Sequence, residues 1–183
     1  KVKPNTVNHE HAYLNAVFAE LKRLGEWTLP NPLEGLPQFK IEDTELAFLY
    51  PEEIPIVLNE CRNAEYEHLV TIVMVCLATG CRWSEAEGLR GNQIAHNRIT
   101  FVKTKGKKNR TVPIAPSLAD LLHRVRGPLF RPCRRSFERA IKRTGLTFPE
   151  GQMTHILRHT FASHFMMNGG NILVLKQILG HAD

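Results

Sequence analysis

A histidine and an arginine stand three residues apart within residues 152–164, Gln-Met-Thr-His-Ile-Leu-Arg-His-Thr-Phe-Ala-Ser-His. If this stretch is a helix, His155 and Arg158 share one face, and Leu157 and Phe161 are left to pack inward. An imidazole exchanges protons near neutral pH, and a guanidinium is a fixed cation whose forked donors fit phosphate oxygens. The pair therefore suits a phosphodiester that must be held while a proton moves. The same spacing also fits a solvated basic helix face, which is the alternative.

Three further places along the chain offer polar groups. In Thr-Gly-Cys-Arg-Trp-Ser-Glu (79–85), Arg82 follows a turn at glycine, and Glu85 can orient it through a charge-assisted pair. Lys105 lies in a basic connection, where a lysine is a phosphate anchor or, beside a leaving oxygen, a proton donor. His181 follows a Leu-Gly step that ends a predicted helix. Taken alone, Arg82 and Glu85 also fit a surface salt bridge, and His181 fits a polar terminus.

The positive charge is concentrated rather than uniform. The net charge is +6 and the pI is about 9.3, with five basic residues at positions 103–110 and eight more between 124 and 143. Such density favours a polyanion, and nucleic acid is the commonest one inside a cell. A well-solvated surface is the alternative. We therefore expect DNA contacts from four further cations of the first cluster, which are Lys103, Lys107, Lys108 and Arg110.

Composition argues against several other classes of protein. The hydrophobic fraction of 43% and charged fraction of 23% are typical of a folded globular chain. The longest apolar run, 69–79, is too short to span a bilayer, so we expect a cytoplasmic protein. No Cys-x-x-Cys pair occurs among the cysteines. His155 and His159 have zinc-motif spacing, but Ile156 stands where that motif has glutamate, so no metal or cofactor is predicted.

The chain divides at a segment rich in proline and glycine. Residues 6–24 predict an amphipathic helix that Asn5 or Thr6 can cap and that Gly25 stops. A linker is expected over 25–46, because four prolines or glycines follow Gly25 before the next periodic segment. The main domain then occupies 47–183.

The main domain is expected to be α+β, mainly helical with a small antiparallel sheet or hairpin. Two β-prone runs, 98–102 and 111–114, are joined by the basic connection and predict a hairpin whose second strand lies at an edge because of Pro113. Ser84 can cap a short helix that runs through Leu89. The other predicted helices are 51–61, 66–79, 117–125, 133–144, 152–168 and 171–179.

The ordered combination of these motifs resembles the tyrosine recombinases, the phage integrase family. It consists of Thr-Gly-Cys-Arg-Trp-Ser-Glu, a lysine in a basic hairpin, His-Ile-Leu-Arg-His-Thr-Phe-Ala, and Leu-Gly-His. The resemblance covers about residues 47–183, and the sequence of residues 152–183 looks most like that of integrases of temperate tailed phages of enterobacteria. By the same resemblance, residues 1–24 look like the last helix of the core-site-binding domain that precedes the catalytic domain.

The resemblance implies a role for each residue of the pattern. Arg82 and Arg158 would hold the scissile phosphate, and Glu85 would support them. Lys105 would protonate the departing 5′-oxygen, His155 would transfer a proton, and His181 would donate to a non-bridging oxygen. Two arginines and a lysine can supply the positive charge that divalent ions provide in many nucleases, so the implied chemistry needs no metal or other cofactor.

In the family the nucleophilic tyrosine lies about nine residues beyond the Leu-Gly-His histidine. The tyrosines of this sequence, Tyr13, Tyr50 and Tyr66, all lie upstream of that histidine. We therefore expect residues 1–183 to be part of a longer protein and to bind DNA without cleaving it.

The resemblance also implies partners. The family works on double-stranded DNA attachment sites in the host bacterial cell, as a tetramer held partly by exchange of C-terminal segments and aided by DNA-bending accessory proteins. The alternative is a DNA-binding regulator that keeps the scaffold without the catalysis.

Overall fold

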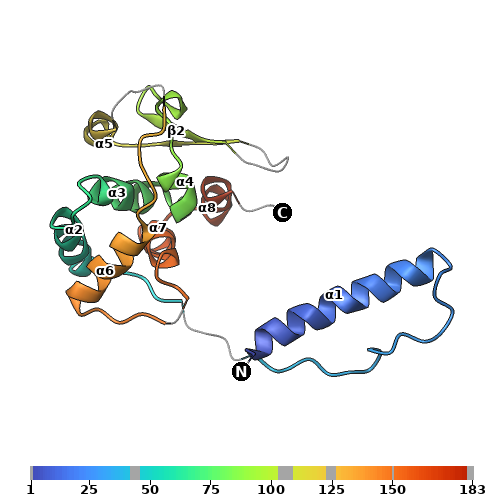
Figure 1. Cartoon of the computed structure of the whole chain (residues 1–183). Helices are drawn as coiled ribbons and strands as arrows, with labels where there is room; N and C mark the ends of the chain where they lie inside the picture. Colours follow the sequence, from blue (N-terminus) through green and yellow to red (C-terminus); the bar gives the residue numbers. More distant parts are fainter. Residues whose placement is uncertain (1, 42–45, 103–108, 123–126, 150, 181–183) are drawn as a thin grey trace. The chain divides into compact units, whose positions relative to one another are not determined.

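The computed structural model describes residues 2–41, 46–102, 109–122, 127–149 and 151–180. It divides into two compact units, residues 1–44 and 45–183, which we call the small unit and the large unit (Figure 1).

The small unit is built on one long helix, α1 (Pro4–Arg23). The helix begins at Pro4 rather than after a cap at Asn5 or Thr6, and Lys3 makes no side-chain cap. Proline suits the first helical position because its fixed φ is already helical and its missing N–H is not needed there. The predicted helix is therefore present, with its start and its cap corrected.

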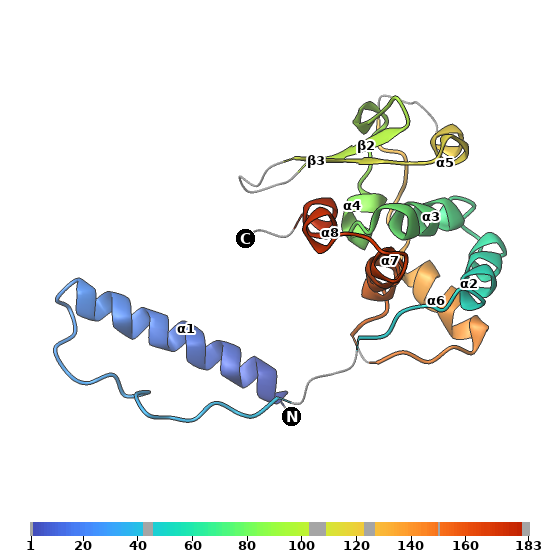
Figure 2. The same ribbon diagram turned by 180° about the vertical axis from the view of Figure 1, so that it is seen from behind.

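The segment after α1 returns along the helix, as the two opposite views show (Figures 1 and 2). The side chain of Asn8 donates to the carbonyl of Phe39 at 2.8 Å and accepts from its N–H at 2.9 Å. Phe18 and Trp27 pack edge to face, with ring centroids 5.1 Å apart. Residues 25–41, expected as a linker, are thus tied to α1 along much of their length.

The large unit is mainly helical with a three-stranded antiparallel sheet, which confirms the predicted fold class. Its helices are α2 (Glu53–Arg62), α3 (Leu69–Thr79), α4 (Trp83–Glu87), the 3₁₀ turn η1 (Gly91–Gln93), α5 (Pro116–Leu121), α6 (Arg134–Thr144), α7 (His155–Met167) and α8 (Ile172–Leu179). Its strands are β1 (Ile94–Ala95), β2 (Arg98–Phe101) and β3 (Arg110–Pro113). In the described part of the chain, no helix is both long and apolar enough to cross a membrane.

Helix α3 forms the centre of the large unit. It is apolar on all sides, and most of its residues are buried, as expected for a helix surrounded by protein. Helix α7 packs along it, α2 packs against both α3 and α6, and the sheet with α5 lies on the side of α3 away from α7 (Figures 1 and 2). The core therefore surrounds α3 and fixes the ends of the helices that carry the predicted site.

The sheet has the order β1-β2-β3, so β3 is an edge strand, as Pro113 predicted. Strand β1 was not predicted, because two residues are too few to show a period. It joins β2 through His96 and Asn97, whose φ angles of 49° and 54° are those of a two-residue hairpin turn. Ile99 and Phe101 point into the core from the middle strand.

Two predicted helix boundaries are also corrected. Helix α4 is capped at Arg82 and not at Ser84, because the Glu85 side chain satisfies the N–H of Arg82. Helix α3 begins at Leu69 rather than at residue 66, since residues 63–68 form turns.

Candidate active site

Arg158 joins two helix ends from inside the large unit. Only 7% of the residue is exposed. Its Nη1 donates to the carbonyl of Gly80, the C-cap of α3, at 2.8 Å, and its Nη2 donates to the carbonyl of Leu179, the last residue of α8, at 2.9 Å. Carbonyls at a helix C-terminus lack intrahelical donors and carry partial negative charge. The guanidinium therefore fixes the turn before Arg82 and the turn before His181 relative to α7.

Helix α7 is held by its apolar face and by two hydrogen bonds to the backbone of Leu49. We call these two bonds the clasp, and the sequence did not reveal them. Leu157 is fully buried. On the neighbouring segment, the Leu49 N–H donates to Thr160 Oγ1 at 2.8 Å, and the Leu49 carbonyl lies 2.9 Å from the His164 ring Nε2. These bonds join residues more than a hundred positions apart, and no local pattern signals them. They leave the face of α7 that bears Arg158 in a defined orientation.

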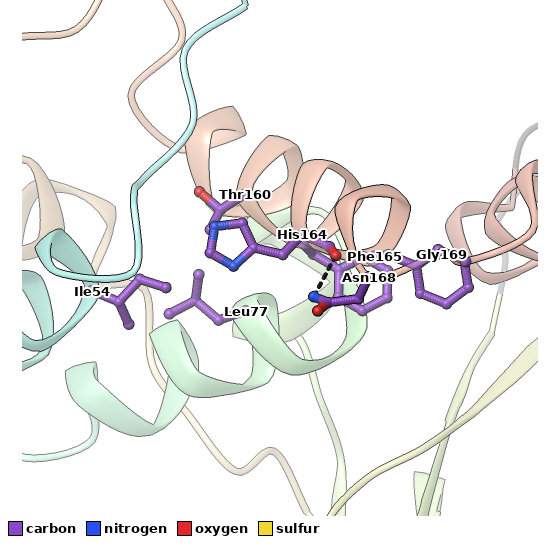
Figure 3. A pocket seen from close by; sticks show the side chains of 9 residues that line it. Ile54, Leu77, Thr160, His164, Phe165, Asn168 and Gly169 are labelled. Atoms are coloured by element: carbon purple, nitrogen blue, oxygen red, sulfur yellow. Dashed lines mark hydrogen bonds between the residues drawn. The ribbon is translucent and has the colours of Figure 1, made fainter.

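A cavity of about 440 Å³ lies beside this clasp, between α7, the end of α3 and the start of α2 (Figure 3). Its polar side chains already serve the protein backbone, since Thr160 and His164 bond to Leu49, and Asn168 Nδ2 donates to the His164 carbonyl at 2.7 Å. None of the residues predicted for the site lines this cavity. The cavity therefore offers packing space and no evident chemistry.

Arg82 stands at the N-terminus of α4, two residues after the turn at Gly80. Gly80 has φ 62°, a left-handed conformation that glycine adopts without steric cost. The Arg82 side chain is 47% exposed, and its Nη1 lies 3.8 Å from Glu85 Oε1. This separation is too long for a strong hydrogen bond, so the Arg82 guanidinium remains accessible to an anion.

The carboxylate of Glu85 pairs mainly with Arg110 and not with the Arg82 side chain. Arg110 Nη1 and Nη2 donate to its two oxygens at 2.8 and 2.7 Å, and the backbone N–H of Arg82 donates to Oε2 at 2.8 Å. Burial alone raises the pKa of Glu85, but the hydrogen bonds from Arg110 and from the Arg82 N–H outweigh it, so the net pKa is lowered. Glu85 is therefore ionised at neutral pH.

Arg110 does not have the place expected of a DNA contact. Only 7% of its side chain is exposed, and its Cζ lies 4.6 Å from the centre of the Phe101 ring. Both terminal nitrogens are bonded to Glu85. The expectation of a DNA contact does not fit this geometry, because the Arg110 donors are paired with a carboxylate that neutralises their charge. The equally buried Arg158 differs, since it donates to neutral carbonyls and keeps its net charge.

The lowered pKa of Glu85 leads to a test by pH. Because the pKa of Glu85 is lower in the folded than in the unfolded chain, this carboxylate stabilises the fold above its ordinary pKa of 4.5, and the contribution is lost as pH falls through the lower pKa of the folded chain. Glu85→Gln should cost ~1–3 kcal/mol at neutral pH by leaving Arg110 without its anion. The variant should also lose less stability than the parent chain on acidification.

Urea unfolding from about pH 7 to about pH 3 measures both effects. Glu138→Gln is the matched control, because Glu138 pairs with Arg134 at the surface and should contribute little. Parallel pH curves for the Glu85 variant and the parent would contradict the assignment.

His155 opens α7 and is exposed, three residues before Arg158. Its ring centre lies 6.2 Å from that of His159. Burial, and then the proximity of His155 and Arg158, lowers the pKa of His159. His159 is thus mainly neutral at physiological pH, and His155 is the more exposed imidazole of the two.

Five predicted site residues lie outside the described parts of the chain. They are Lys103, Lys105, Lys107, Lys108 and His181. The described segments place their neighbours, since β2 ends at Phe101, β3 begins at Arg110, and the Leu179 carbonyl is bound by Arg158.

The described part of the site carries more positive than negative charge. Three guanidiniums, those of Arg82, Arg110 and Arg158, gather around the carboxylate of Glu85. Burial, and then the charges of Arg82 and Arg110, lowers the pKa of Arg158 to about 10, which still leaves it charged at neutral pH. A bound anion would relieve this repulsion, so the arrangement suits a phosphate group. Within the described residues, no cluster of three His, Cys, Asp or Glu is placed to hold a metal ion.

Comparison with known proteins identifies the family. Residues 47–127 match the phage integrase family, and residues 1–40 match the phage integrase N-terminal domain. The structure of the catalytic domain of bacteriophage HP1 integrase is 58% identical, with a TM-score of 0.73 over 76% of this chain and 83% of that one. The chain belongs to the phage integrase family.

The sequences of phage integrases are similar over almost the whole chain. The integrase of Haemophilus phage HP1 is 59% identical over 98% of the chain, and that of Escherichia phage 186 is 53% identical over 100%. The chain spans about half the length of these relatives, 53% and 55%. The Tn1549 transposon integrase, solved with circular intermediate DNA, is only 18% identical but has a TM-score of 0.79 over 100% of this chain and 73% of its own, and so shares the fold.

Proposed function

We propose that the integrase containing this chain performs site-specific recombination, integrating and excising phage DNA by cutting and rejoining one strand at a time. The observation that carries the proposal is the buried Arg158, which ties the turn before Arg82 to the turn before His181. These two hydrogen bonds join three separated motifs of the family pattern around one cluster of positive charge. Family membership supports the same reaction class.

Each residue of the pattern then has a role in the reaction. Arg82 and Arg158 hold the scissile phosphate, and Glu85 supports Arg82. A tyrosine oxygen attacks phosphorus, the bond to the 5′-oxygen breaks, and a 3′-phosphotyrosyl link forms. Lys105 donates the proton that the departing 5′-oxygen takes up, and His155 transfers the proton of the tyrosine hydroxyl. His181 donates a hydrogen bond to a non-bridging oxygen.

The guanidiniums stabilise the negative charge that develops on the phosphate, so this mechanism requires no metal ion. The phosphotyrosyl link conserves the energy of the broken bond, so religation requires no nucleotide cofactor. The 5′-hydroxyl of the partner strand attacks the link and releases the tyrosine.

The partner is double-stranded DNA at attachment sites, in the cytoplasm of the host bacterium. Lys103, Lys107 and Lys108 contact its backbone, whereas Arg110 is engaged inside the protein. Residues 1–24 end a core-site-binding domain, 25–46 link it to the catalytic domain, and 47–183 belong to the catalytic domain. The working form is a tetramer on DNA that exchanges C-terminal segments and acts with DNA-bending proteins.

None of the tyrosines in residues 1–183 is proposed as the nucleophile. Tyr66 is buried, its hydroxyl accepts the Arg131 N–H at 3.0 Å, and the Arg131 guanidinium covers its ring at 4.9 Å. Tyr50 and Tyr13 are exposed but lie before the motifs that bind the phosphate. Residues 1–183 should therefore bind DNA without cutting it.

A nicked attachment-site substrate, which traps a covalent intermediate, tests this proposal. Residues 1–183 should shift the DNA in a gel, with an affinity that falls as salt rises, and should form no adduct. The longer integrase is the positive control and should form the adduct in the presence of EDTA. A covalent adduct formed by residues 1–183 would refute the missing-nucleophile proposal, and absence of DNA binding at low salt would refute the proposed substrate.

A further inference from the structure

We propose that Arg110 is a positioning residue that keeps the carboxylate of Glu85 away from the Arg82 guanidinium, so that Arg82 stays free for the phosphate. The inference rests on the proposed function in one respect, namely that Arg82 binds a DNA phosphate. It assigns to Arg110 a role inside the site in place of the DNA contact that its position in a basic stretch suggested.

The first support is the competition for Glu85. Glu85 and Arg82 stand three residues apart, a spacing at which opposite charges pair readily. In the structure the pairing is incomplete, with 3.8 Å between Arg82 Nη1 and Glu85 Oε1, whereas both Glu85 oxygens lie within 2.8 Å of Arg110. A planar bidentate pair is the stronger arrangement, so Arg110 binds both carboxylate oxygens and the Arg82 charge is only partly compensated.

The second support is that Arg110 is itself fixed. The Phe101 ring covers its guanidinium, and the residues are direct partners in the β2–β3 register. Its Nε is buried without a hydrogen-bond partner among the described residues. Arg110 thus keeps Nη1 and Nη2 on Glu85 although its buried Nε has no acceptor among the described residues. Its side chain is therefore oriented toward Glu85 and not toward solvent.

The third support is the place of the pair in the chain. Arg110 is the first residue of β3, and Phe101 is the last residue of β2, so they stand at the base of the connection that contains Lys105. Glu85 belongs to α4 and also accepts the N–H of Arg82. The Arg110–Glu85 pair thus joins the base of the hairpin to α4 and to Arg82, the N-cap residue of α4.

A double-mutant cycle tests the inference on residues 1–183. Arg110→Gln frees Glu85 to pair with Arg82, and should lower DNA affinity by about tenfold, the size of one lost charge-assisted contact. It should also reduce the salt slope by about one phosphate contact. Adding Glu85→Gln removes the competing charge, so the double variant should recover most of the affinity and the slope. If Arg110 instead bound DNA directly, the second substitution would restore neither, and the inference would be wrong.

Chemical modification gives a readout that does not depend on DNA. An arginine-specific dicarbonyl reagent, followed by peptide mass mapping, should modify Arg82 readily in the parent chain, more slowly in Arg110→Gln, and readily again in the double variant. Unchanged Arg82 reactivity in Arg110→Gln would overturn the inference even if the parent chain bound no DNA. Failure of the parent chain to bind DNA, with the expected modification pattern, would count against the proposed function alone.

Two controls complete the design. Arg98→Gln removes one exposed positive charge from the same sheet and reports the general electrostatic cost. Arg110→Lys keeps the charge but not the bidentate fork, so it should restore part of the Arg110→Gln loss. If Arg110→Gln does not fold, the double variant, which leaves neither charge of the pair, still decides the question by comparison with Glu85→Gln alone.

Discussion

In the reaction proposed above, Arg158→Ala should reduce strand cleavage by an integrase that contains this chain about a hundredfold to a thousandfold, the loss of one transition-state donor. The parent chain presents a buried, oriented guanidinium in a cluster with excess positive charge. Overall DNA affinity should change less, because many other basic residues share the electrostatic contacts. Single-turnover cleavage of a nicked attachment-site substrate, with binding measured in parallel, separates the two quantities.

The same substitution should also destabilise the large unit. The carbonyls of Gly80 and Leu179 lose their donors, and each unsatisfied buried group costs ~1–3 kcal/mol. Relief of repulsion with Arg82 and Arg110 offsets part of this cost, so we expect a net loss of about 2–4 kcal/mol. Urea unfolding of residues 1–183 measures it.

Two matched variants are the controls for Arg158→Ala. Arg135→Ala removes an exposed arginine from α6 and should leave both stability and cleavage almost unchanged. Arg158→Lys keeps the charge but lacks the fork that reaches both carbonyls, so it should recover little activity. DNA affinity that fell as steeply as cleavage would make Arg158 a binding anchor and not a group that acts in the transition state.

Gly80→Ala should be among the most destabilising single-methyl changes in the chain. A Cβ at this position would lie 2.4 Å from Phe161 Cδ1 and 2.7 Å from Leu179 Cδ2, and the backbone has φ 62°. A left-handed alanine costs ~1–2 kcal/mol, and overpacking adds ~1–3 kcal/mol, so we expect a loss of about 2–5 kcal/mol.

Gly145→Ala is the control for the free-energy cost of placing alanine in a left-handed backbone conformation. Gly145 caps α6 with φ 74°, and a Cβ there would meet nothing within 4 Å. Its replacement should cost only ~1–2 kcal/mol. Chemical denaturation of both variants gives the comparison, and equal losses would show that the packing of Phe161 and Leu179 against Gly80 is not tight.

Displacement at Gly80 should also affect the site. Its carbonyl accepts from Arg158, and the turn that it makes leads directly to Arg82. We therefore expect Gly80→Ala to reduce cleavage even where the protein remains folded.

Several features of this protein follow from local sequence alone. A mostly apolar run of helical length predicts α3, and proline predicts the edge position of β3. The spacing of His155 and Arg158, and the glycine turn before Arg82, are likewise local properties. These predictions succeed because periodicity, turn chemistry and motif order are set by neighbours in the chain.

Only the tertiary structure decided how the charges are shared. Sequence spacing predicted that Glu85 pairs with Arg82 and that Arg110 contacts DNA. In the folded chain, Arg110 instead binds both oxygens of Glu85, which lies 25 positions away. It also directs Arg158 to carbonyls that lie 78 and 21 positions away. These pairings depend on which charged groups are buried together and on which geometry satisfies the most hydrogen-bond donors. No single stretch of sequence contains that information. The sequence by itself determined which charged groups the site has, and the packing around α3 decided which of them pair and which remains open to a phosphate.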